Sequence, residues 1–277
     1  MKKTITITSS KRLMFSDLLE LRDYKDLIYY LFRKEVIATY KQSIFGILWF
    51  FAQPISLTLV YYFVFSEVAN LKISSMPPTL FYLSGVVVWS TFLEIYTQTA
   101  TSLVNNASLF NKVYFPRLIA PLATTSTVLL KTVVQFFGIT LFCIYSFYFL
   151  DFPISFDPLI LLSGIFLIVI LAMGLGLIVA SLSVSYKDIK FILNYLVGLL
   201  MYVSPVMYSI ESLDHKYSTL IEYNPLTSIL CFIRGGLVND YPLNQNNLFY
   251  AIGFCFICFI IGIFTFGMVE KDCVDKV

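Results

Sequence analysis

Long apolar runs separated by short polar links make up most of this chain. A helix that crosses about 30 Å of hydrocarbon needs roughly 20 apolar residues, because each residue adds 1.5 Å. Six stretches meet this requirement, so the pattern predicts an all-α integral membrane protein with six transmembrane helices over 44–268. The predicted spans are Ile44–Phe65, Leu80–Thr101, Leu118–Phe149, Leu159–Leu182, Phe191–Tyr208 and Leu248–Met268.

The N-terminal arm, 1–43, contains an amphipathic stretch that leads into the first predicted span. Leu27, Ile28, Leu31 and Phe32 recur at helical spacing, and basic residues mostly occupy the other side. A cationic amphipathic helix is expected to lie along the inner membrane surface. An ordinary solvated helix is the alternative, because Glu35 and Ile37 blur the pattern. The residues assigned to this interface helix are Arg33, Lys34, Tyr40 and Lys41.

The long link after the fifth predicted span has a different pattern. Pro205 is expected to end or kink that span, and the apolar stretch "LTSILCFIRGGL" is too short to cross a membrane. Because Gly235 and Gly236 stop it, we expect a re-entrant segment on the outer face, within about 205–237. The alternative is a seventh, poorly formed span.

Composition supports the membrane prediction. Of the 277 residues, 58% are hydrophobic and 13% are charged, which is about half the charged fraction of a soluble domain. Cys255 and Cys258 form a CxxC inside an apolar run, but no second pair completes a metal site. His215 is the single histidine, so the sequence predicts no metal centre.

Basic residues indicate the orientation. The arm before Gln42 has nine of the 19 lysines and arginines. The side that holds the termini carries 15 of them, and the opposite side carries Lys72, Lys216 and Arg234. Because cytoplasmic loops are enriched in lysine and arginine, we expect both termini in the cytoplasm, including a tail over 269–277. A seventh span would place that tail outside, so the bias argues against it.

The sequence contains no phosphate-binding loop GxxxxGK[ST] and no HExxH or GxSxG motif. We therefore expect no catalytic residues and no nucleotide site in this chain. Two charges fall inside predicted spans, Glu94 and Lys131. With cytoplasmic helix ends near Thr101 and Leu118, their depths differ by roughly 9 Å. They either form an ion pair or face a polar cavity separately, and such charges indicate function by default.

Aromatic residues are abundant in the spans, and some are candidates to line a conduit, since flat rings offer faces to sugar CH groups. Interfacial anchoring or core packing is the alternative for each of them. The candidates are Trp49, Trp89, Phe92 and Tyr96.

Five stretches match motifs of a known family. The stretch "RKEVIATYKQSIFGILWFFAQPI" precedes and enters the first span, "NASLFNKVYFPRLIAPLA" links the second and third spans, and "YKDIK", "SPVMY" and "YNPL" follow. Together they resemble the membrane subunits of ABC-2 type transporters, and more narrowly the permeases that export lipid-linked polysaccharides such as O-antigen. The matching positions are Arg33, Tyr40, Lys41, Ser43, Gly46, Trp49, Gln53, Pro54, Asn106, Leu109, Lys112, Val113, Phe115, Pro116, Pro121, Lys187, Asp188, Ser204, Pro205, Asn224 and Pro225.

This resemblance implies a homodimer that pairs with two copies of a separate ATPase, which binds ATP and magnesium. It implies a coupling helix at about 105–121 seated on that ATPase, outer gate helices, and an aromatic-lined polymer channel. The implied coupling residues are Asn106, Leu109, Lys112, Val113, Phe115, Pro116, Arg117, Lys187 and Asp188. The implied outer-gate residues are Pro205, Tyr208, Asn224, Pro225 and Arg234.

The sequence thus predicts a permease subunit, not an enzyme, that exports a lipid-linked, O-antigen-like polysaccharide across the bacterial inner membrane during lipopolysaccharide biosynthesis. No nucleic-acid partner is expected. A sibling exporter of teichoic acid, capsule, or a small hydrophobic drug or lipid is the main alternative. A membrane enzyme would need clustered acids or histidines, and an ion-coupled permease would need a richer chain of ionisable groups.

Overall fold

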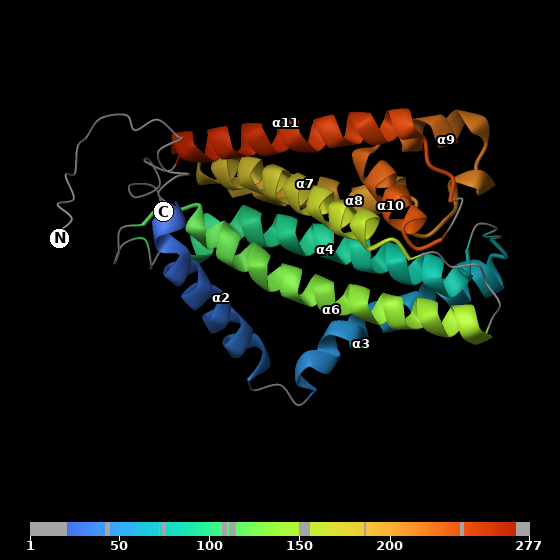
Figure 1. The fold of residues 1–277 in the computed structure, drawn as a ribbon. Coiled ribbons are helices and arrows are strands. Elements are labelled where there is room, and N and C mark those ends of the chain that lie inside the picture. The colour runs from blue at the N-terminus through green and yellow to red at the C-terminus, as the bar shows by residue number, and fades with distance from the viewer. Residues whose placement is uncertain are drawn as a thin grey trace.

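The computed structural model describes residues 21–41, 45–71, 73, 76–106, 110, 115–149, 156–185, 187–238 and 241–269. Helices make up most of this part of the chain, and they run roughly lengthwise in an elongated bundle (Figure 1). The all-α prediction is therefore confirmed for the described residues.

Among the residues that the structure describes, five helical segments are long and apolar enough to cross a membrane. Three of them extend a predicted span at both ends. The first starts two residues later and ends three residues later than predicted, and the third starts one residue later and ends at the predicted residue. The first segment, Gly46–Val68, consists of a short 3-10 helix, α3 (Trp49–Tyr61) and the π-helix η3 (Tyr62–Val68). The other four are α4 (Pro78–Asn105), α6 (Ile119–Phe149), α7 (Pro158–Ser185) and α11 (Gln245–Val269).

The remaining predicted span corresponds to α8 (Lys187–Val203), which is shorter. Its 17 residues measure about 26 Å at 1.5 Å per residue. The helix ends five residues before the predicted boundary at Tyr208, because Pro205 cannot continue it and the chain turns over 204–206. Two short helices follow in the long link, α9 (His215–Glu222) and α10 (Pro225–Gly235), at the same end of the bundle as the start of α11 (Figure 1).

The centre of the bundle is formed by α4 and α7, whose apolar side chains are mostly buried. Small residues let neighbouring helices approach closely. An added Cβ on Gly176 of α7 would lie 2.6 Å from the Thr99 Cβ of α4, and one on Gly262 of α11 would lie 2.5 Å from the Gly174 carbonyl oxygen. Gly174 and Gly176 of α7 thus pack against α11 and α4 within the chain.

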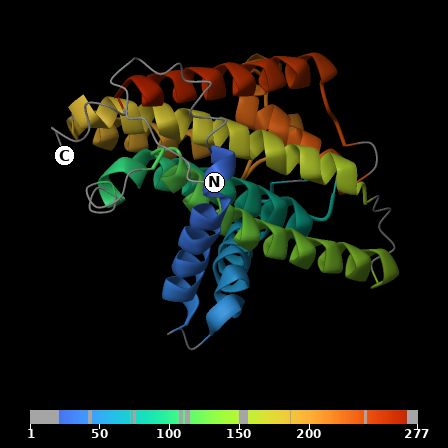
Figure 2. The same cartoon turned by 60° about the vertical axis from the view of Figure 1, so that its left-hand side comes forward.

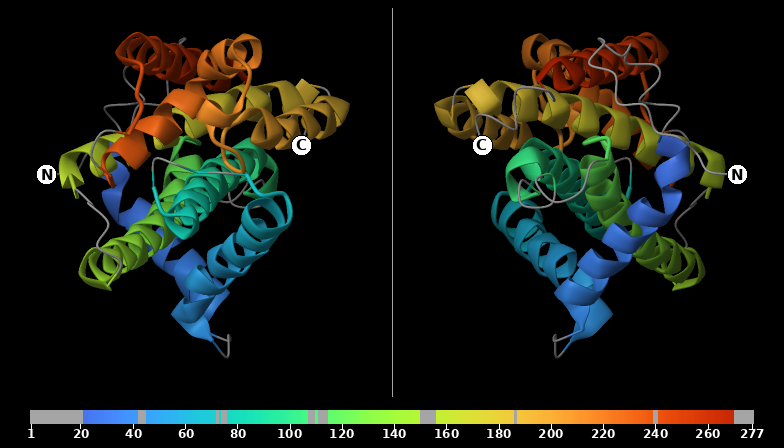
Figure 3. Two further views of the ribbon diagram at one scale, coloured as in Figure 1. Left: turned by 90° about the vertical axis from the view of Figure 1, so that its right-hand side faces the viewer. Right: turned by 90° about the vertical axis from the view of Figure 1, so that its left-hand side faces the viewer.

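Two elements extend away from the bundle. Helix α2 (Lys25–Tyr40) and α3 converge on a point outside it and form a V (Figures 2 and 3). Gln135 of α6 donates a hydrogen bond to the Phe50 carbonyl of α3 over 2.8 Å, and α2 packs against α6. The start of α2 and the end of α11 lie at the same end of the bundle (Figure 1).

Candidate functional site

The described residues of the link between α4 and α6, which are Asn106, Phe110 and 115–118, form a compact seat at one end of the bundle. The Asn106 side chain donates to the Ser102 carbonyl over 2.9 Å and closes the end of α4. The Phe110 and Phe115 ring centroids are 5.4 Å apart, and the Arg117 guanidinium lies 5.6 Å from the Phe110 centroid, a cation–π arrangement.

Burial shows which way the described part of this link faces. Phe115, Pro116 and Arg117 are buried, with 9% of Arg117 exposed. Leu118 packs with three buried side chains of α4, α7 and α11, namely Leu103, Leu177 and Phe266. These residues face the bundle in this structure, and their contact with a partner subunit stays a prediction. The predicted coupling residues Leu109, Lys112 and Val113 lie outside the described residues.

The start of α8 lies at the same end of the bundle as this link (Figure 1). Lys187 and Asp188 form its first turn, where the Asp188 carboxylate complements the positive end of the helix dipole. Asp188 is exposed.

The predicted interface helix is present as α2. Arg33, Lys34 and Lys41 are exposed, and the predicted apolar positions such as Leu31 and Phe32 are half-buried. Tyr40 is its last residue. The exposed side thus carries the basic side chains together with two tyrosines and Ile37, and the position of the helix at a membrane surface stays a prediction.

The two charges inside the spans form an ion pair. Lys131 Nζ of α6 lies 2.7 Å from Glu94 Oε2 of α4. Their depths are nearly equal, because α4 continues to Asn105, 11 residues beyond Glu94, and α6 starts at Ile119, 12 residues before Lys131. The expected 9 Å difference was wrong because it placed the end of α4 too early. The Lys131 side chain is 15% exposed and the Glu94 side chain is 32% exposed.

A third charged residue, Glu35 of α2, is held by α6 and is influenced by the charge of Glu94. Thr127 of α6 donates to Glu35 Oε2 over 3.3 Å. Burial raises the pKa of the Glu35 carboxyl above 4.5, the Thr127 hydrogen bond opposes this, and the Glu94 charge adds to it. The sequence analysis did not assign Glu35 a role, although an acid on a cationic helix was a usable signal.

At the other end of the bundle, Arg234 of α10 is completely buried. A buried guanidinium needs acceptors for its donors, and Arg234 finds them in other elements. Nη1 donates to the Pro205 carbonyl over 2.9 Å, and Nη2 donates to the Phe81 carbonyl of α4 over 3.0 Å. Longer contacts of 3.4 Å reach the hydroxyls of Ser84 and Tyr241.

The guanidinium carbon of Arg234 also lies 3.6 Å from the Phe81 ring centroid. Arg234 therefore joins α10 to α4 and to the turn after α8. The sequence analysis counted it among the basic residues on the side opposite the termini and assigned it to the outer gate, and the structure places its side chain inside the bundle. Its partners Ser84 and Tyr241 were not identified from the sequence.

The SPVMY and YNPL motifs contact each other close to Arg234. Asn224 is the N-cap of α10, where Oδ1 accepts from the Leu226 amide over 3.1 Å, and its Nδ2 donates to Ser204 Oγ over 3.1 Å. Pro225 occupies the first helical position, which suits proline. Tyr208 donates to the Tyr202 carbonyl over 3.0 Å. These contacts fix α10 against the end of α8.

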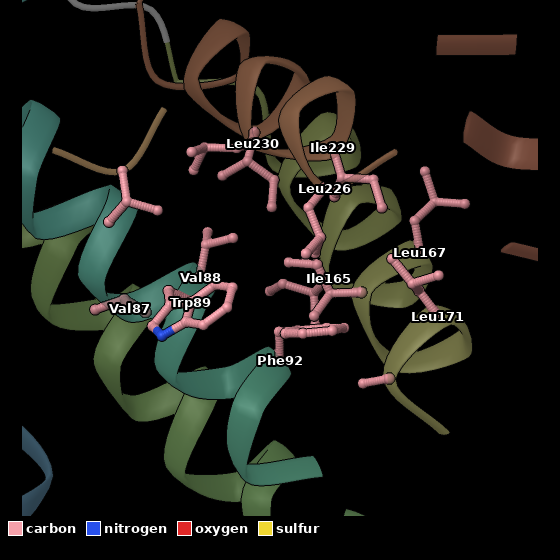
Figure 4. Packing of buried hydrophobic residues seen from close by; sticks show 14 of the residues in the cluster. Val87, Val88, Trp89, Phe92, Ile165, Leu167, Leu171, Leu226, Ile229 and Leu230 are labelled. Atoms are coloured by element: carbon pink, nitrogen blue, oxygen red, sulfur yellow. The ribbon is translucent and has the colours of Figure 1, made fainter. Parts of the chain in front are cut away.

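The candidate channel aromatics separate into two groups. Trp89, Phe92 and Tyr96 are buried, and Trp89 and Phe92 face side chains of α7 and α10, including Ile165 (Figure 4). Trp49 is 52% exposed. In this conformation Trp49 alone of the four offers an open ring face, and the channel role stays a prediction.

Comparison with known proteins gives consistent matches. A family model described as ABC-2 type transporter matches residues 26–238. The chain is 30% identical over 255 residues to the O-antigen export system permease protein RfbA of Klebsiella pneumoniae, covering 88% of this chain and 92% of that protein. It is 26% identical to a protein of the same name in Myxococcus xanthus, with 76% and 80% covered. It is also 22% identical to the polysialic acid transport protein KpsM of Escherichia coli, with 87% and 92% covered.

Proposed function

The chain belongs to the ABC-2 type transporter family, and from this membership we propose that it is a permease subunit that exports a lipid-linked polysaccharide across the bacterial inner membrane. The observation that carries this proposal is the match to O-antigen export permeases over nearly the full length of both proteins. The more distant match to the polysialic acid transport protein KpsM favours polysialic acid as the second candidate substrate.

ATP hydrolysis by a separate subunit, which binds ATP and magnesium, supplies the energy. The absence of a phosphate-binding loop from the sequence supports this division of labour. The 105–121 link is the coupling segment. The contacts of Phe110, Phe115 and Arg117, together with the packing of Leu118 against three helices, favour rigid transmission from this link into the bundle. The start of α8, with Lys187 and Asp188, lies close enough to the same end to belong to the docking surface.

The proposed topology has six spans, with α8 as the fifth and both termini in the cytoplasm. Support comes from the course of α8, which runs beside α7 and returns the chain to the end where α9 and α10 lie (Figure 1). Helix α10 is apolar, largely buried and only 11 residues long, as a re-entrant gate helix requires.

The functional unit is proposed to be a homodimer with the polymer path near the subunit boundary. Much of α3 and α8 is apolar, aromatic and exposed in the single chain, which favours contact with a second copy, with substrate or with lipid. The exposed aromatic residues of these two segments and their adjoining turns include Trp49, Phe63, Phe191, Tyr195 and Tyr202.

Deletion and complementation in the host strain test this function. Without the chain, we expect surface polysaccharide to disappear and lipid-linked polymer to accumulate on the cytoplasmic side of the inner membrane. Restoring the chain restores export, and susceptibility to sialidase or other polymer-specific hydrolases distinguishes the two candidate substrates. Normal surface polysaccharide in the deletion strain contradicts the proposal.

A further inference from the structure

A cavity of about 630 Å³ lies at the α9–α10 end of the bundle. It is lined by residues 209–213, by one side of α9 and α10, and by the stretch that enters α11. Its size falls within the range of about 300–1,000 Å³ that is typical of small-molecule sites. Polar side chains from all these segments converge on it, including Glu211, Glu222, Thr227, Tyr241 and Asn247.

Thr227 of α10 provides the sharpest indication of a ligand. Its side chain is 1% exposed and lines the cavity, and its hydroxyl has no hydrogen-bond partner within the described part of the chain. Helical threonines commonly donate back to the carbonyl four residues earlier, as Thr132 and Thr140 do here. A buried hydroxyl without a partner is costly, so Thr227 is suited to bind a group that enters the cavity.

The charge of the cavity limits what that group can be. Glu211 and Glu222 contribute carboxylates, and none of the described lining residues is lysine or arginine. Asn247 Nδ2 donates to Glu222 Oε2 over 3.1 Å and orients both side chains. Carboxylates accept hydrogen bonds from hydroxyl groups, but they repel phosphates and acidic sugars. The described residues contain no group of three or more metal-ligating side chains, which disfavours a metal ion.

Apolar lining residues complete the chemistry. Ile210, Leu213 and Leu243 contribute hydrocarbon surface beside the carboxylates and hydroxyls. A sugar ring has the matching pattern, with hydroxyl groups around its edge and CH groups on its faces. We propose that this cavity is a binding site for an uncharged sugar unit of the exported polymer at the outer end of its path. This inference rests on the proposed function and adds a site to it.

The cavity is connected to the rest of the bundle through Tyr241. Its hydroxyl lies 3.4 Å from Arg234 Nη1, and Arg234 in turn holds α10 to α4 and to the turn after α8. A sugar in the cavity therefore contacts the same wall that positions the outer helices. Occupancy favours the arrangement of α9 and α10 seen here.

The test uses the complete permease–ATPase complex in lipid nanodiscs. The probes are delipidated polysaccharide fragments released by mild acid from the host strain, with polysialic acid oligomers as an acidic comparison. Saturation-transfer NMR is expected to detect the host fragments when they are uncharged and to give a much weaker signal for the acidic oligomers. Thr227→Val and Glu222→Gln are each expected to weaken fragment binding about three- to tenfold, as the loss of one hydrogen bond implies.

The matched control is Thr125→Val. Thr125 is also buried, and its hydroxyl also lacks a partner among the described residues, but it belongs to α6 and does not line the cavity. It is expected to bind like wild type. Neither threonine variant is expected to lower the melting temperature, because each removes a buried hydroxyl that has no partner among the described residues.

Three results would overturn the inference: no fragment binding to wild type, unchanged affinity in Thr227→Val, or equal binding of acidic oligomers. The deletion strain separates this failure from failure of the proposed function. If export requires the chain but any of these results is obtained, only the cavity assignment is wrong.

Discussion

Lys131 of α6 and Glu94 of α4 form a 2.7 Å ion pair midway along two helices that are long and apolar enough to span a membrane. The pair stands beside a second polar contact between these helices, in which the Thr91 and Thr132 hydroxyls are 3.0 Å apart. Charges inside a membrane are costly unless they are paired. The ion pair therefore holds α4 and α6 together, and these are the two helices that the 105–121 link connects.

The ion pair predicts an asymmetry between single and double variants. Lys131→Met or Glu94→Gln alone leaves one charge without its partner and is expected to cost about 1–2 kcal/mol, less than a fully buried pair because both groups are partly exposed. The double variant is expected to recover most of this loss. Thermal unfolding of the purified permease measures it, with exposed Lys216→Met as the control. A double variant that loses the sum of both single effects contradicts the pairing.

Glu35 predicts a pH dependence. Because burial raises the pKa of its carboxyl above 4.5, the folded chain holds this proton more tightly than the unfolded chain. Its contribution to stability is therefore greatest below pH 4.5 and is lost as the pH rises through the folded-state pKa. Glu35→Gln is expected to flatten this part of the stability profile and to raise the melting temperature at pH 7–8.

Asp26→Asn, an exposed change on the same helix, is the control and is expected to keep the wild-type slope. If Glu35→Gln also keeps that slope above pH 4.5, the carboxyl is not held as the structure indicates.

Arg234 predicts that a conservative change is not tolerated. Arg234→Lys keeps the charge, but its single ammonium group cannot reach both carbonyl acceptors and lie over the Phe81 ring. We expect a loss of about 2–4 kcal/mol from unsatisfied buried groups, measured as a lower melting temperature. Arg33→Lys, an exposed change on α2, should have no effect. Equal melting temperatures for the two variants would show that Arg234 is not a structural anchor.

The contact between α7 and α11 predicts different results for two glycines on one helix. A Cβ at Gly262 would lie 2.5 Å from the Gly174 carbonyl oxygen, whereas one at Gly253 meets nothing within 4 Å. Gly262→Ala is expected to destabilise by about 1–3 kcal/mol through overpacking, and Gly253→Ala to be neutral or to stabilise by up to about 1 kcal/mol. Detergent-solubilised protein followed by fluorescence on heating measures both, and a tolerated Gly262→Ala contradicts the close approach.

If the 105–121 link docks on the ATPase, reversing the charge of Lys112 should weaken the binding of the ATPase. Arg117 is a poor test because it is 9% exposed and a charge reversal there would disturb the seat itself. Lys112→Glu is expected to reduce ATPase co-purification at least fivefold with normal permease stability. Lys216→Glu, at the opposite end of the chain's fold, should co-purify normally. Undiminished co-purification in Lys112→Glu would remove this lysine from the docking surface.

The sequence predicted the helical architecture well, because an apolar run of about 20 residues, at 1.5 Å per residue, has the length and composition of a membrane-spanning helix. It placed the start of α6 within one residue and matched its end at Phe149. It left open whether Trp89 and Phe92 line a channel or pack in the core, because aromatic composition does not distinguish the two.

Long-range contacts were the least predictable part of the site. The partners of Arg234 lie up to 153 residues away in sequence, so no local pattern links them. The pairing of Lys131 with Glu94 was left open because an error of a few residues in a helix end moves a side chain by several Å along the axis.

The most direct test of the account is ATP-dependent transport by purified components. Proteoliposomes would contain this chain with its partner ATPase, and labelled lipid-linked polysaccharide would be supplied on the side where the ATPase is exposed. The account predicts that the polymer becomes protected inside the vesicles only with ATP and magnesium, and that neither subunit alone suffices. Protection that needs no ATP, or that occurs without this chain, would contradict it.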